Sequence, residues 1–323
     1  MHGRASLAQM GAFMMALRTK RETVQELTGL VDVMLDNAVK LETGSDALDI
    51  VGTGGDLVGT VNISSMASIV AAAAGVPVLK HGSRSASGKT GSSEMLEELG
   101  IRLDLSPSQV AQVFAKEGIT FFFAPVFHPA MRHVAPARKE LGVPTTFNFL
   151  GPLANPAQPI ATALGVADAE IAPLMAAELA TRGRTAIVFR SNDGLDELST
   201  TSDNAIWQVS KGAIETFTFD AREIGIERVS VDALLGGDAR HNAQIAKKLF
   251  SGEEFQNSKA ISDIVCLNAA VGITAYDLAK DSRQSETEIN QRLSVAFAKA
   301  QTALTSGAAL AKTKQWSVLT QTI

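Results

Sequence analysis

The sequence of 323 residues contains one cysteine, one tyrosine and two tryptophans. A single cysteine excludes an internal disulfide and fits a reducing compartment, so we expect a cytoplasmic protein. We interpret Cys266 as a small core residue and not as a nucleophile. An excess of positive charge is also absent, because the net charge at pH 7 is −5. This balance argues against a nucleic-acid-binding surface.

Long apolar runs are missing as well. No stretch approaches 18 consecutive apolar residues, so we expect no membrane span. The N-terminus lacks the apolar core of a secretory signal peptide. Hydrophobic residues nevertheless make up 46% of the chain, which suffices for a sizeable core. The length allows one large domain or two unequal ones.

Glycine gathers in two loops, at residues 49–65 and 78–94. Each loop follows a short apolar run typical of a buried strand and leads into a helix-like segment. Glycine lets backbone N–H groups approach an anion closely, and the free N–H groups of a helix N-terminus favour phosphate. Asn62 or Ser64 can cap the first of these helices. We therefore predict two phosphate-binding loops facing one crevice, suited to a substrate with two phosphate groups.

The second loop is also basic and rich in hydroxyl groups. Its end, Gly88-Lys89-Thr90, resembles that of a P-loop. Five residues separate Gly82 from Gly88, whereas a P-loop requires four. This spacing argues against a P-loop ATPase.

Short strands and helices alternate after residue 46, which predicts an α/β fold with a mostly parallel sheet. Apolar stripes and two capping boxes predict two helices within residues 6–41. A further helix starts at Ser106-Pro107, and residues 205–219 read as a hairpin that turns at Lys211-Gly212. The expected strands span residues 47–51, 76–80, 101–105, 119–124, 162–167 and 185–190.

Eight motifs, in order along nearly the whole chain, resemble those of the anthranilate phosphoribosyltransferases. Their number and order make the resemblance specific. They are GTGGD (52–56), NIS (62–64), KHG (80–82), HPAMRHVAPARKELG (128–142), FNFLGPLANP (147–156), DGLDEL (193–198), LLGGDARHNA (234–243) and CLNAA (266–270).

The resemblance implies a small all-helical N-terminal domain at residues 1–45, joined by a helix at 128–142, and a large α/β domain at 46–323. Members of that family carry two more helices ahead of the segment that begins at Gly3, and they form homodimers through the helical domain. A homodimer is therefore the expected assembly, with no nucleic-acid or membrane partner.

The implied reaction transfers the phosphoribosyl group from 5-phosphoribosyl 1-pyrophosphate to anthranilate. Its products are N-(5-phosphoribosyl)anthranilate and pyrophosphate, in a step of L-tryptophan biosynthesis. Displacement at the anomeric carbon with a highly charged leaving group depends on position and electrostatics, not on a covalent nucleophile. Lys80 and Arg138 would contribute electrostatically, and two magnesium ions per subunit would neutralise the pyrophosphate.

The resemblance assigns binding roles residue by residue. Ser64, Asp196 and Glu197 match magnesium ligands. The positions matching the phosphoribosyl pyrophosphate site are Gly52, Gly55, Asp56, Thr60, Asn62, Ile63, Ser64, Ser65, Lys80, His81, Gly82, Arg84, Ser87, Gly88 and Ser92.

Anthranilate needs a cation and an apolar wall. Arg138 matches the family's carboxylate-binding arginine, and a guanidinium fork suits a carboxylate. The other positions that match the acceptor site are Gly52, His81, Ser83 and His128.

Two departures from the family pattern lie in the glycine-rich loops. Ser83 replaces an asparagine that contacts anthranilate, so we expect weaker acceptor binding or a slightly enlarged pocket. Leu57 replaces a common glycine, and we expect that this position does not need a positive φ.

Three alternatives remain. A phosphoribosyltransferase with another aromatic acceptor is open because of Ser83. A pyrimidine nucleoside phosphorylase would share the architecture but would not need the Asp196-Glu197 pair. A non-catalytic relative that binds nucleic acid or a partner enzyme would have eroded phosphate loops and a basic face.

Overall fold

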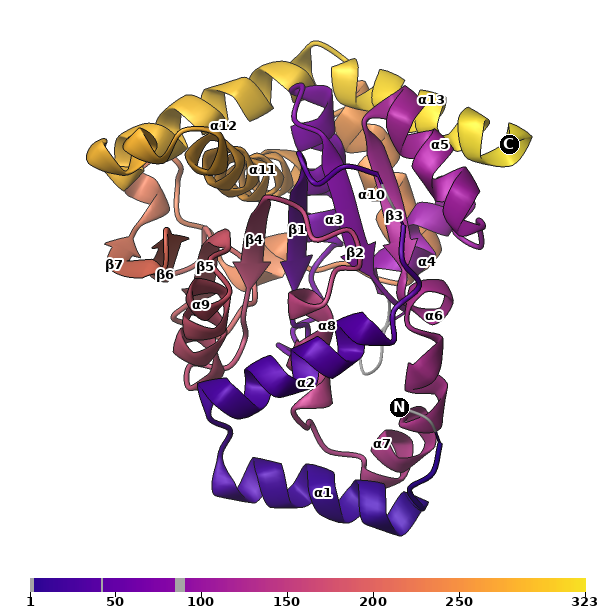
Figure 1. Ribbon diagram of the computed structural model, residues 1–323. Helices are drawn as coiled ribbons and strands as arrows, with labels where there is room; N and C mark the ends of the chain where they lie inside the picture. Colours follow the sequence, from indigo (N-terminus) through magenta and orange to yellow (C-terminus); the bar gives the residue numbers. More distant parts are fainter. Residues whose placement is uncertain (1–2, 42, 85–90) are drawn as a thin grey trace.

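A computed structural model describes residues 3–41, 43–84 and 91–323 (Figure 1). Ser87 and Gly88, two of the residues expected to bind phosphate, lie outside these ranges. The protein is built on one seven-stranded sheet with the order β3-β2-β1-β4-β5-β6-β7. The strands are β1 (Leu48–Gly52), β2 (Val78–Gly82), β3 (Ile119–Phe123), β4 (Ala161–Gly165), β5 (Thr185–Ser191), β6 (Asn204–Ser210) and β7 (Ala213–Phe219).

The first five strands are parallel, and β6 and β7 form the expected antiparallel hairpin. The mostly parallel α/β sheet expected from the sequence is therefore confirmed. The chain runs outward from β1 to β3 and then returns to place β4 on the other side of β1. The strand order thus reverses between β1 and β4, and α/β proteins bind ligands at the carboxyl ends of the strands beside such a point.

Helices surround the sheet (Figure 1). The longer ones are α1 (Leu7–Lys20), α2 (Val24–Asp36), α3 (Ile63–Ala73), α5 (Pro107–Glu117), α9 (Ile171–Thr181), α10 (Ala239–Ser251), α11 (Ser258–Lys280), α12 (Ile289–Thr305) and α13 (Ala308–Thr322). The shorter ones are α4 (Ser92–Glu98), α6 (Ala124–Phe127), α7 (Ala135–Leu141), α8 (Phe147–Leu153), and the 3-10 helices η1 (Pro129–His133), η2 (Ala221–Ile224), η3 (Val231–Leu234) and η4 (Ser282–Glu286).

The two faces of the sheet pack into two separate clusters. Alternate strand residues such as Ile50 and Ile187 join a large core with α3 and α10 to α13. Their neighbours Val51 and Val188 face the opposite way and pack with α2, α8 and α9. This alternation follows from the two-residue period of a strand. Both faces of the parallel strands are buried, as is typical of parallel sheets, whereas β7 at the edge is mostly exposed.

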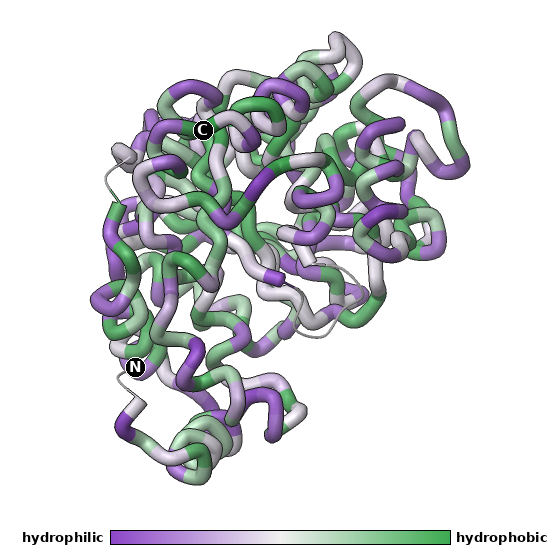
Figure 2. The backbone as a smooth tube through the Cα atoms, turned by 90° about the vertical axis from the view of Figure 1, so that its right-hand side faces the viewer, coloured by the Kyte–Doolittle hydropathy of each residue, from purple (hydrophilic) through white to green (hydrophobic). Residues whose placement is uncertain are grey.

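The N-terminal helices α1 and α2 lie below the sheet (Figure 1), and the view turned by 90° shows the N-terminus toward the same lower end (Figure 2). The capping boxes Ser6–Gln9 and Thr23–Glu26 begin α1 and α2, as expected. Met14 of α1 packs against Ala137 of α7, so a segment from the middle of the chain joins the N-terminal helices. This segment differs from the single helix expected at 128–142, because η1 and α7 divide it around Val134.

The expectation of a strand at residues 101–105 was wrong. Ile101, Leu103 and Leu105 are buried alternately as in a strand, but the segment belongs to no sheet that the structure describes. The Arg102 N–H donates instead to Thr320 Oγ1 at 3.1 Å, in the last turn of α13. Burial against a helix therefore reproduces the pattern of a half-buried strand.

By length and hydropathy α11 could cross a membrane, although Asp263 and Asn268 interrupt its apolar residues. In this protein 83% of its most apolar 18-residue window is buried, and it packs against α3, α12 and the sheet. It therefore has the position of a core helix. Cys266 lies within it, fully buried, and burial raises the pKa of its thiol to about 12. The interpretation of Cys266 as a core residue is confirmed.

Candidate active site

The carboxyl ends of the parallel strands meet at one edge of the sheet (Figure 1). β1 ends at Gly52, β2 at Gly82 and β4 at Gly165. The Thr53 N–H donates to the Gly165 carbonyl at 3.0 Å, which joins the ends of β1 and β4 where the strand order reverses. Both glycine-rich loops leave the sheet at this edge, as the sequence predicts.

An acidic loop after β5 lies directly on the first glycine-rich turn. The Gly54 N–H donates to the Asp196 carboxylate at 2.7 Å. A side chain at Gly52 would meet the same carboxylate, because an added Cβ would lie 2.3 Å from Asp196 Oδ2. Burial raises the pKa of Asp196 to about 7, and repulsion from Asp56 adds to this shift. Asp196, an expected magnesium ligand, and Gly52, an expected phosphate-binding residue, thus meet here.

Glu197 reaches the second element of the site, the N-terminus of α3. Its pKa is raised well above the usual value by burial and by repulsion from Asp196, while Lys80 and the Ser64 N–H act in the opposite direction. Lys80 Nζ also lies 3.5 Å from Ser64 Oγ. The structure therefore brings together Ser64, Asp196 and Glu197, the three expected magnesium ligands.

This group of residues fits a hard cation. Glu197 is buried and Asp196 half-buried. The two carboxyls carry the same charge, and each destabilises the charged form of its neighbour, which a divalent cation would reverse. Among the described residues no group of three or more His, Cys, Asp or Glu is placed to hold a metal ion by itself. Two carboxyls and a hydroxyl supply only part of a coordination shell, which suits Mg²⁺ because it usually keeps waters and substrate phosphate oxygens.

Lys80 is placed differently from the exposed phosphate ligand that its loop suggests. It is only 1% exposed, and Nζ donates to the Ile50 carbonyl at 2.6 Å. Its charge faces Asp49 and Glu197. Lys80 therefore joins the ends of β1 and β2 beneath the acidic loop and acts on the site through these neighbours.

Asp49, which sequence reasoning missed, organises the buried polar groups below the site. Its carboxylate accepts the His81 N–H at 3.1 Å and the Asn155 amide at 2.8 Å. Burial raises the pKa of Asp49 to about 6, although Lys80 and the two donors oppose the shift. The available signal was a carboxylate inside an otherwise apolar strand, since a buried charge requires partners.

His81 and His128 form a pair at the ends of β2 and α6. Their ring centroids are 5.1 Å apart in an edge-to-face arrangement, and His81 Nδ1 lies 3.0 Å from the Gly151 carbonyl. Burial lowers the pKa of His81 to about 3 and that of His128 to about 4. Both imidazoles are therefore neutral at pH 7, and each is only 3% exposed.

The neutral state of His81 predicts a pH-dependent stability. Because the folded pKa lies below the usual 6.5, the unfolded state binds a proton that the folded state rejects as pH falls below 6.5. With a folded pKa of about 3, this residue alone should cost about 3 kcal/mol of stability at pH 4.5. Urea unfolding of His81→Gln at pH 7 and 4.5 should therefore show a smaller acid loss than the unmodified protein. An equal loss in both proteins would contradict the assignment.

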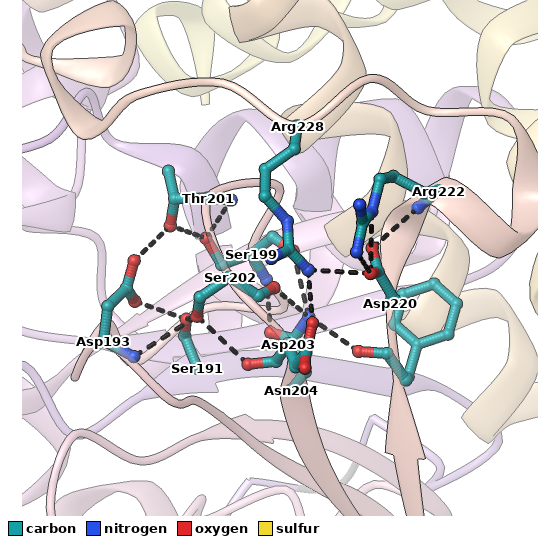
Figure 3. A network of polar contacts seen from close by, with 11 residues as sticks. Ser191, Asp193, Ser199, Thr201, Ser202, Asp203, Asn204, Asp220, Arg222 and Arg228 are labelled. Atoms are coloured by element: carbon teal, nitrogen blue, oxygen red, sulfur yellow. Dashed lines mark hydrogen bonds and ion pairs between the residues drawn. The ribbon is translucent and has the colours of Figure 1, made fainter.

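Hydrogen bonds hold the acidic loop from both of its ends. Asp193 accepts from the hydroxyls of Ser191 and Thr201, which point toward it (Figure 3). Its N–H bonds Ser202 Oγ at 3.2 Å. Asn268 of α11 pairs with both backbone groups of Leu198, at 3.0 Å and 2.9 Å. Leu198, next to Glu197, is therefore fixed to the core. Asn268 belongs to the motif at 266–270, to which the sequence assigned no role, and this contact gives that motif a structural one.

A second set of ion pairs supports the far end of this loop. Arg228 bridges Asp203 and Asp220, and Arg222 also bonds Asp220 (Figure 3). Hydrogen bonds with Arg222 and Arg228 lower the pKa of Asp220. Asp203 immediately precedes β6, and its carbonyl accepts the Asn192 N–H at 2.9 Å. The loop's two ends are therefore held together beside the β6–β7 hairpin.

The other residues expected in the two glycine-rich loops differ in burial and in their contacts. Gly82 has no space for a side chain, because an added Cβ would lie 2.6 Å from Ser92 Oγ. Ile63 and Ser65 are buried, so they can offer only backbone groups. Arg84 is engaged by Glu97 at 2.8 Å, while Ser83 is exposed beside it.

Arg138 lies on α7, among the helices below the sheet edge (Figure 1). It is half-buried, and burial lowers the pKa of its guanidinium. Within the described ranges no hydrogen bond or ion pair occupies this side chain. The structure does not bring it into contact with the His81–His128 pair.

Two expectations about the first loop were wrong. Asn62 precedes α3 but its side chain makes no capping hydrogen bond; it is engaged by Asn242 and Gly91 instead. Leu57 has a φ of 59°, so this position does adopt the left-handed conformation that favours glycine. Its side chain is 77% exposed, and the leucine carries this backbone strain without compensating burial.

Family patterns match almost the whole chain. The pattern described as "Glycosyl transferase family, a/b domain" matches residues 44–310, and "Glycosyl transferase family, helical bundle domain" matches residues 1–38. Fold and site together define the class: a transferase of the glycosyl transferase family, with an acidic pair set on a glycine-rich turn.

Relatives narrow this class. The chain is 50% identical over 321 residues to anthranilate phosphoribosyltransferase of Leifsonia xyli subsp. xyli, covering 99% of this chain and 91% of the relative. The enzyme of Clavibacter michiganensis is 46% identical over 322 residues, with coverage of 99% and 91%. The chain belongs to the anthranilate phosphoribosyltransferase family.

Solved structures agree. The crystal structure of anthranilate phosphoribosyltransferase from Thermus thermophilus superposes with a TM-score of 0.87 at 37% identity, covering 99% of this chain and 92% of the other. The enzyme from Saccharomyces cerevisiae in complex with PRPP and Mg has a TM-score of 0.87 at 26% identity, with coverage of 98% and 86%.

Proposed function

We propose that this chain transfers the phosphoribosyl group of 5-phosphoribosyl 1-pyrophosphate to anthranilate at the carboxyl edge of β1, β2 and β4. The observation that carries this proposal is the contact of Asp196 with Gly54. It sets the acidic loop on the glycine-rich turn, so that cation and phosphate ligands converge. The family, and the PRPP and Mg complex of the yeast relative, support the same reaction.

The two glycine-rich loops would hold the donor substrate. Backbone N–H groups of the turns and of the α3 N-terminus favour phosphate oxygens, and hydroxyl groups add donors. Lys80 would contribute charge from beneath the loops. The described residues assigned to the donor site are Gly52, Gly55, Asp56, Thr60, Asn62, Ile63, Ser64, Ser65, Lys80, His81, Gly82, Arg84 and Ser92.

Ser64, Asp196 and Glu197 would hold magnesium, with two ions per subunit. Bound by these residues, magnesium would supply positive charge that neutralises pyrophosphate as a leaving group. The acidic loop, fixed by Asn268 and Asp193, keeps the two carboxyls in place before substrate arrives. Such preorganisation reduces the reorganisation needed in the transition state.

The acceptor would lie beside the histidine pair. His81 and His128 are neutral at pH 7, so their rings can form part of an uncharged wall for the anthranilate ring, with Gly52 and Ser83 nearby. Arg138 would bind the carboxylate, since its guanidinium is half-buried and unpaired among the residues described. The aromatic amine is already neutral at pH 7 and needs no strong base before it attacks the anomeric carbon.

Ser83 should set acceptor affinity. Asparagine at this position would add an amide donor within reach of the acceptor, whereas serine leaves room for water. Ser83→Asn should lower the KM for anthranilate about fivefold, the value of roughly one hydrogen bond, and leave the KM for phosphoribosyl pyrophosphate unchanged. Steady-state kinetics with each substrate varied will measure both. An unchanged anthranilate KM would show that Ser83 does not limit binding and would favour a different aromatic acceptor.

The reaction itself is tested by the loss of anthranilate fluorescence on addition of phosphoribosyl pyrophosphate. We expect a loss with Mg²⁺ and none after chelation with EDTA. The folded state is checked in parallel by circular dichroism. A folded protein that leaves the fluorescence unchanged with Mg²⁺ would overturn the proposal, and substituted aromatic amines would then be the next acceptors to test.

We further propose a homodimer formed through the helices of residues 1–45 and the segment 128–142, with the α/β domain at 46–323. Leu7, Phe13 and Val33 on these helices are exposed, which is typical of an interface. Analytical ultracentrifugation of Phe13→Glu would test this assembly. The single cysteine supports a cytoplasmic location.

A further inference from the structure

A strap of residues 234–242 crosses the first glycine-rich loop. The Val61 N–H donates to the Leu234 carbonyl, and the Gly236 N–H donates to the Gly59 carbonyl, both at 2.9 Å. An added Cβ at Gly236 would lie 2.6 Å from Asn242 Oδ1 and 2.9 Å from the Thr60 carbonyl oxygen. The strap therefore presses directly on the loop, and Asn242 lies at its end.

Asn242 lies near the start of α10, is 1% exposed, and uses both ends of its side-chain amide. Its Oδ1 accepts the Gly237 N–H at 2.8 Å, and its Nδ2 donates to Asn62 Oδ1 at 2.8 Å. Asn62 in turn donates from Nδ2 to the Gly91 carbonyl at 3.1 Å. These bonds connect α10, the start of α3 and the end of the second glycine-rich loop.

Both ends of the Asn62 amide are thereby occupied. An asparagine at this position ordinarily turns its Oδ1 back onto the N–H groups of the first helical turn. Here Asn242 holds that oxygen, and Asn62 makes no capping bond. The Ile63 N–H bonds the Val61 carbonyl at 2.7 Å, and the Ser64 N–H faces the Glu197 carboxylate. The Ser65 N–H is therefore the group that Asn62 leaves uncapped, and an uncapped N–H is what a phosphate needs at a helix N-terminus.

We propose that Asn242 is a positioning residue for the donor substrate: it holds the Asn62 side chain away from the helix start and so keeps the Ser65 N–H of α3 free for phosphate. The same pair of bonds fixes the separation of the two glycine-rich loops. This inference rests on the proposed function, because it assigns α3 to the phosphate-bearing donor.

Asn242→Leu is the informative variant, since it removes the Nδ2 donor with little change of volume and adds no charge. Asn62 Oδ1 is then free to cap the Ser65 N–H. The KM for phosphoribosyl pyrophosphate should rise about tenfold, as expected for loss of one good hydrogen bond to the substrate. The kcat and the KM for anthranilate should change less than about twofold. If the leucine variant folds poorly, Asn242→Asp is the second variant to measure, because it keeps an oxygen that accepts the Gly237 N–H and still removes the Nδ2 donor.

A double-mutant cycle with Asn62→Ala separates this role from general support of the fold. Alanine cannot cap, so Asn242→Leu should add less than about twofold to the KM of Asn62→Ala. An equal tenfold rise in both backgrounds, or no rise in either, would overturn the proposal. Pyrophosphate binding, measured by isothermal titration calorimetry with Mg²⁺, should weaken in parallel. That binding needs no turnover, so failure of this inference is distinguishable from failure of the proposed reaction.

Discussion

Gly165→Ala is expected to lower kcat/KM by at least about a hundredfold while the protein stays folded. Gly165 ends β4 and is buried between β1 and β5. An added Cβ would lie 1.7 Å from the Asp196 carbonyl oxygen and 2.6 Å from its carbonyl carbon. Because these are backbone atoms, the acidic loop must shift as a whole. Misplacement of catalytic groups by about 1 Å can cost a hundredfold in rate.

A matched control is Gly29→Ala. Gly29 lies inside α2, and no atom comes within 4 Å of its added Cβ. Alanine should favour the helix at this position and leave kcat/KM unchanged. Circular dichroism and the half-saturating Mg²⁺ concentration should be measured for both variants. A Gly165→Ala enzyme with near-normal turnover would mean that the acidic loop tolerates displacement, and the role given to its position would be wrong.

The sheet was predictable because most of the parallel strands contain a short apolar run, and β1, β2 and β4 end at glycine. The exception, residues 101–105, shows why such readings fail. Alternate burial against α13 gives the same pattern as pairing in a sheet, and only the partner of the Arg102 N–H distinguishes them. Local sequence reports which side chains are buried but not what buries them.

The same limit of local sequence applies to the residues of the site. Residues that line the glycine-rich loops could be assigned from motifs, since loop chemistry is local. Asp49, Asn155, Asn242 and Asn268 could not, because each acts on a group between 32 and 180 positions away along the chain. Asn62 shows the consequence. Its position predicts a cap, and a residue 180 positions later prevents it.

The second large effect is expected for Glu197→Gln, in which activity and stability should move in opposite directions. Burial and Asp196 disfavour the charged form of Glu197, so its pKa is raised well above the usual value. At pH 7 this carboxyl is ionised in the unfolded chain but disfavoured as an ion in the folded one, so it lowers the free energy of unfolding. A neutral amide at the same position carries no such cost. Without Mg²⁺ the variant should be more stable by about 1 kcal/mol, while its kcat/KM at saturating Mg²⁺ should fall at least about a hundredfold.

Urea unfolding without metal and steady-state kinetics with metal measure the two effects, and Glu254→Gln is the control. Glu254 is exposed, so its variant should match the unmodified protein in both experiments. A Glu197→Gln protein that loses stability together with activity would show that the carboxyl supports the fold, for example through Lys80. A gain of stability with loss of activity would identify Glu197 as a group held in an unfavourable state by its neighbours. Such a carboxyl is relieved when a divalent cation binds, as expected of a site that stores strain for function.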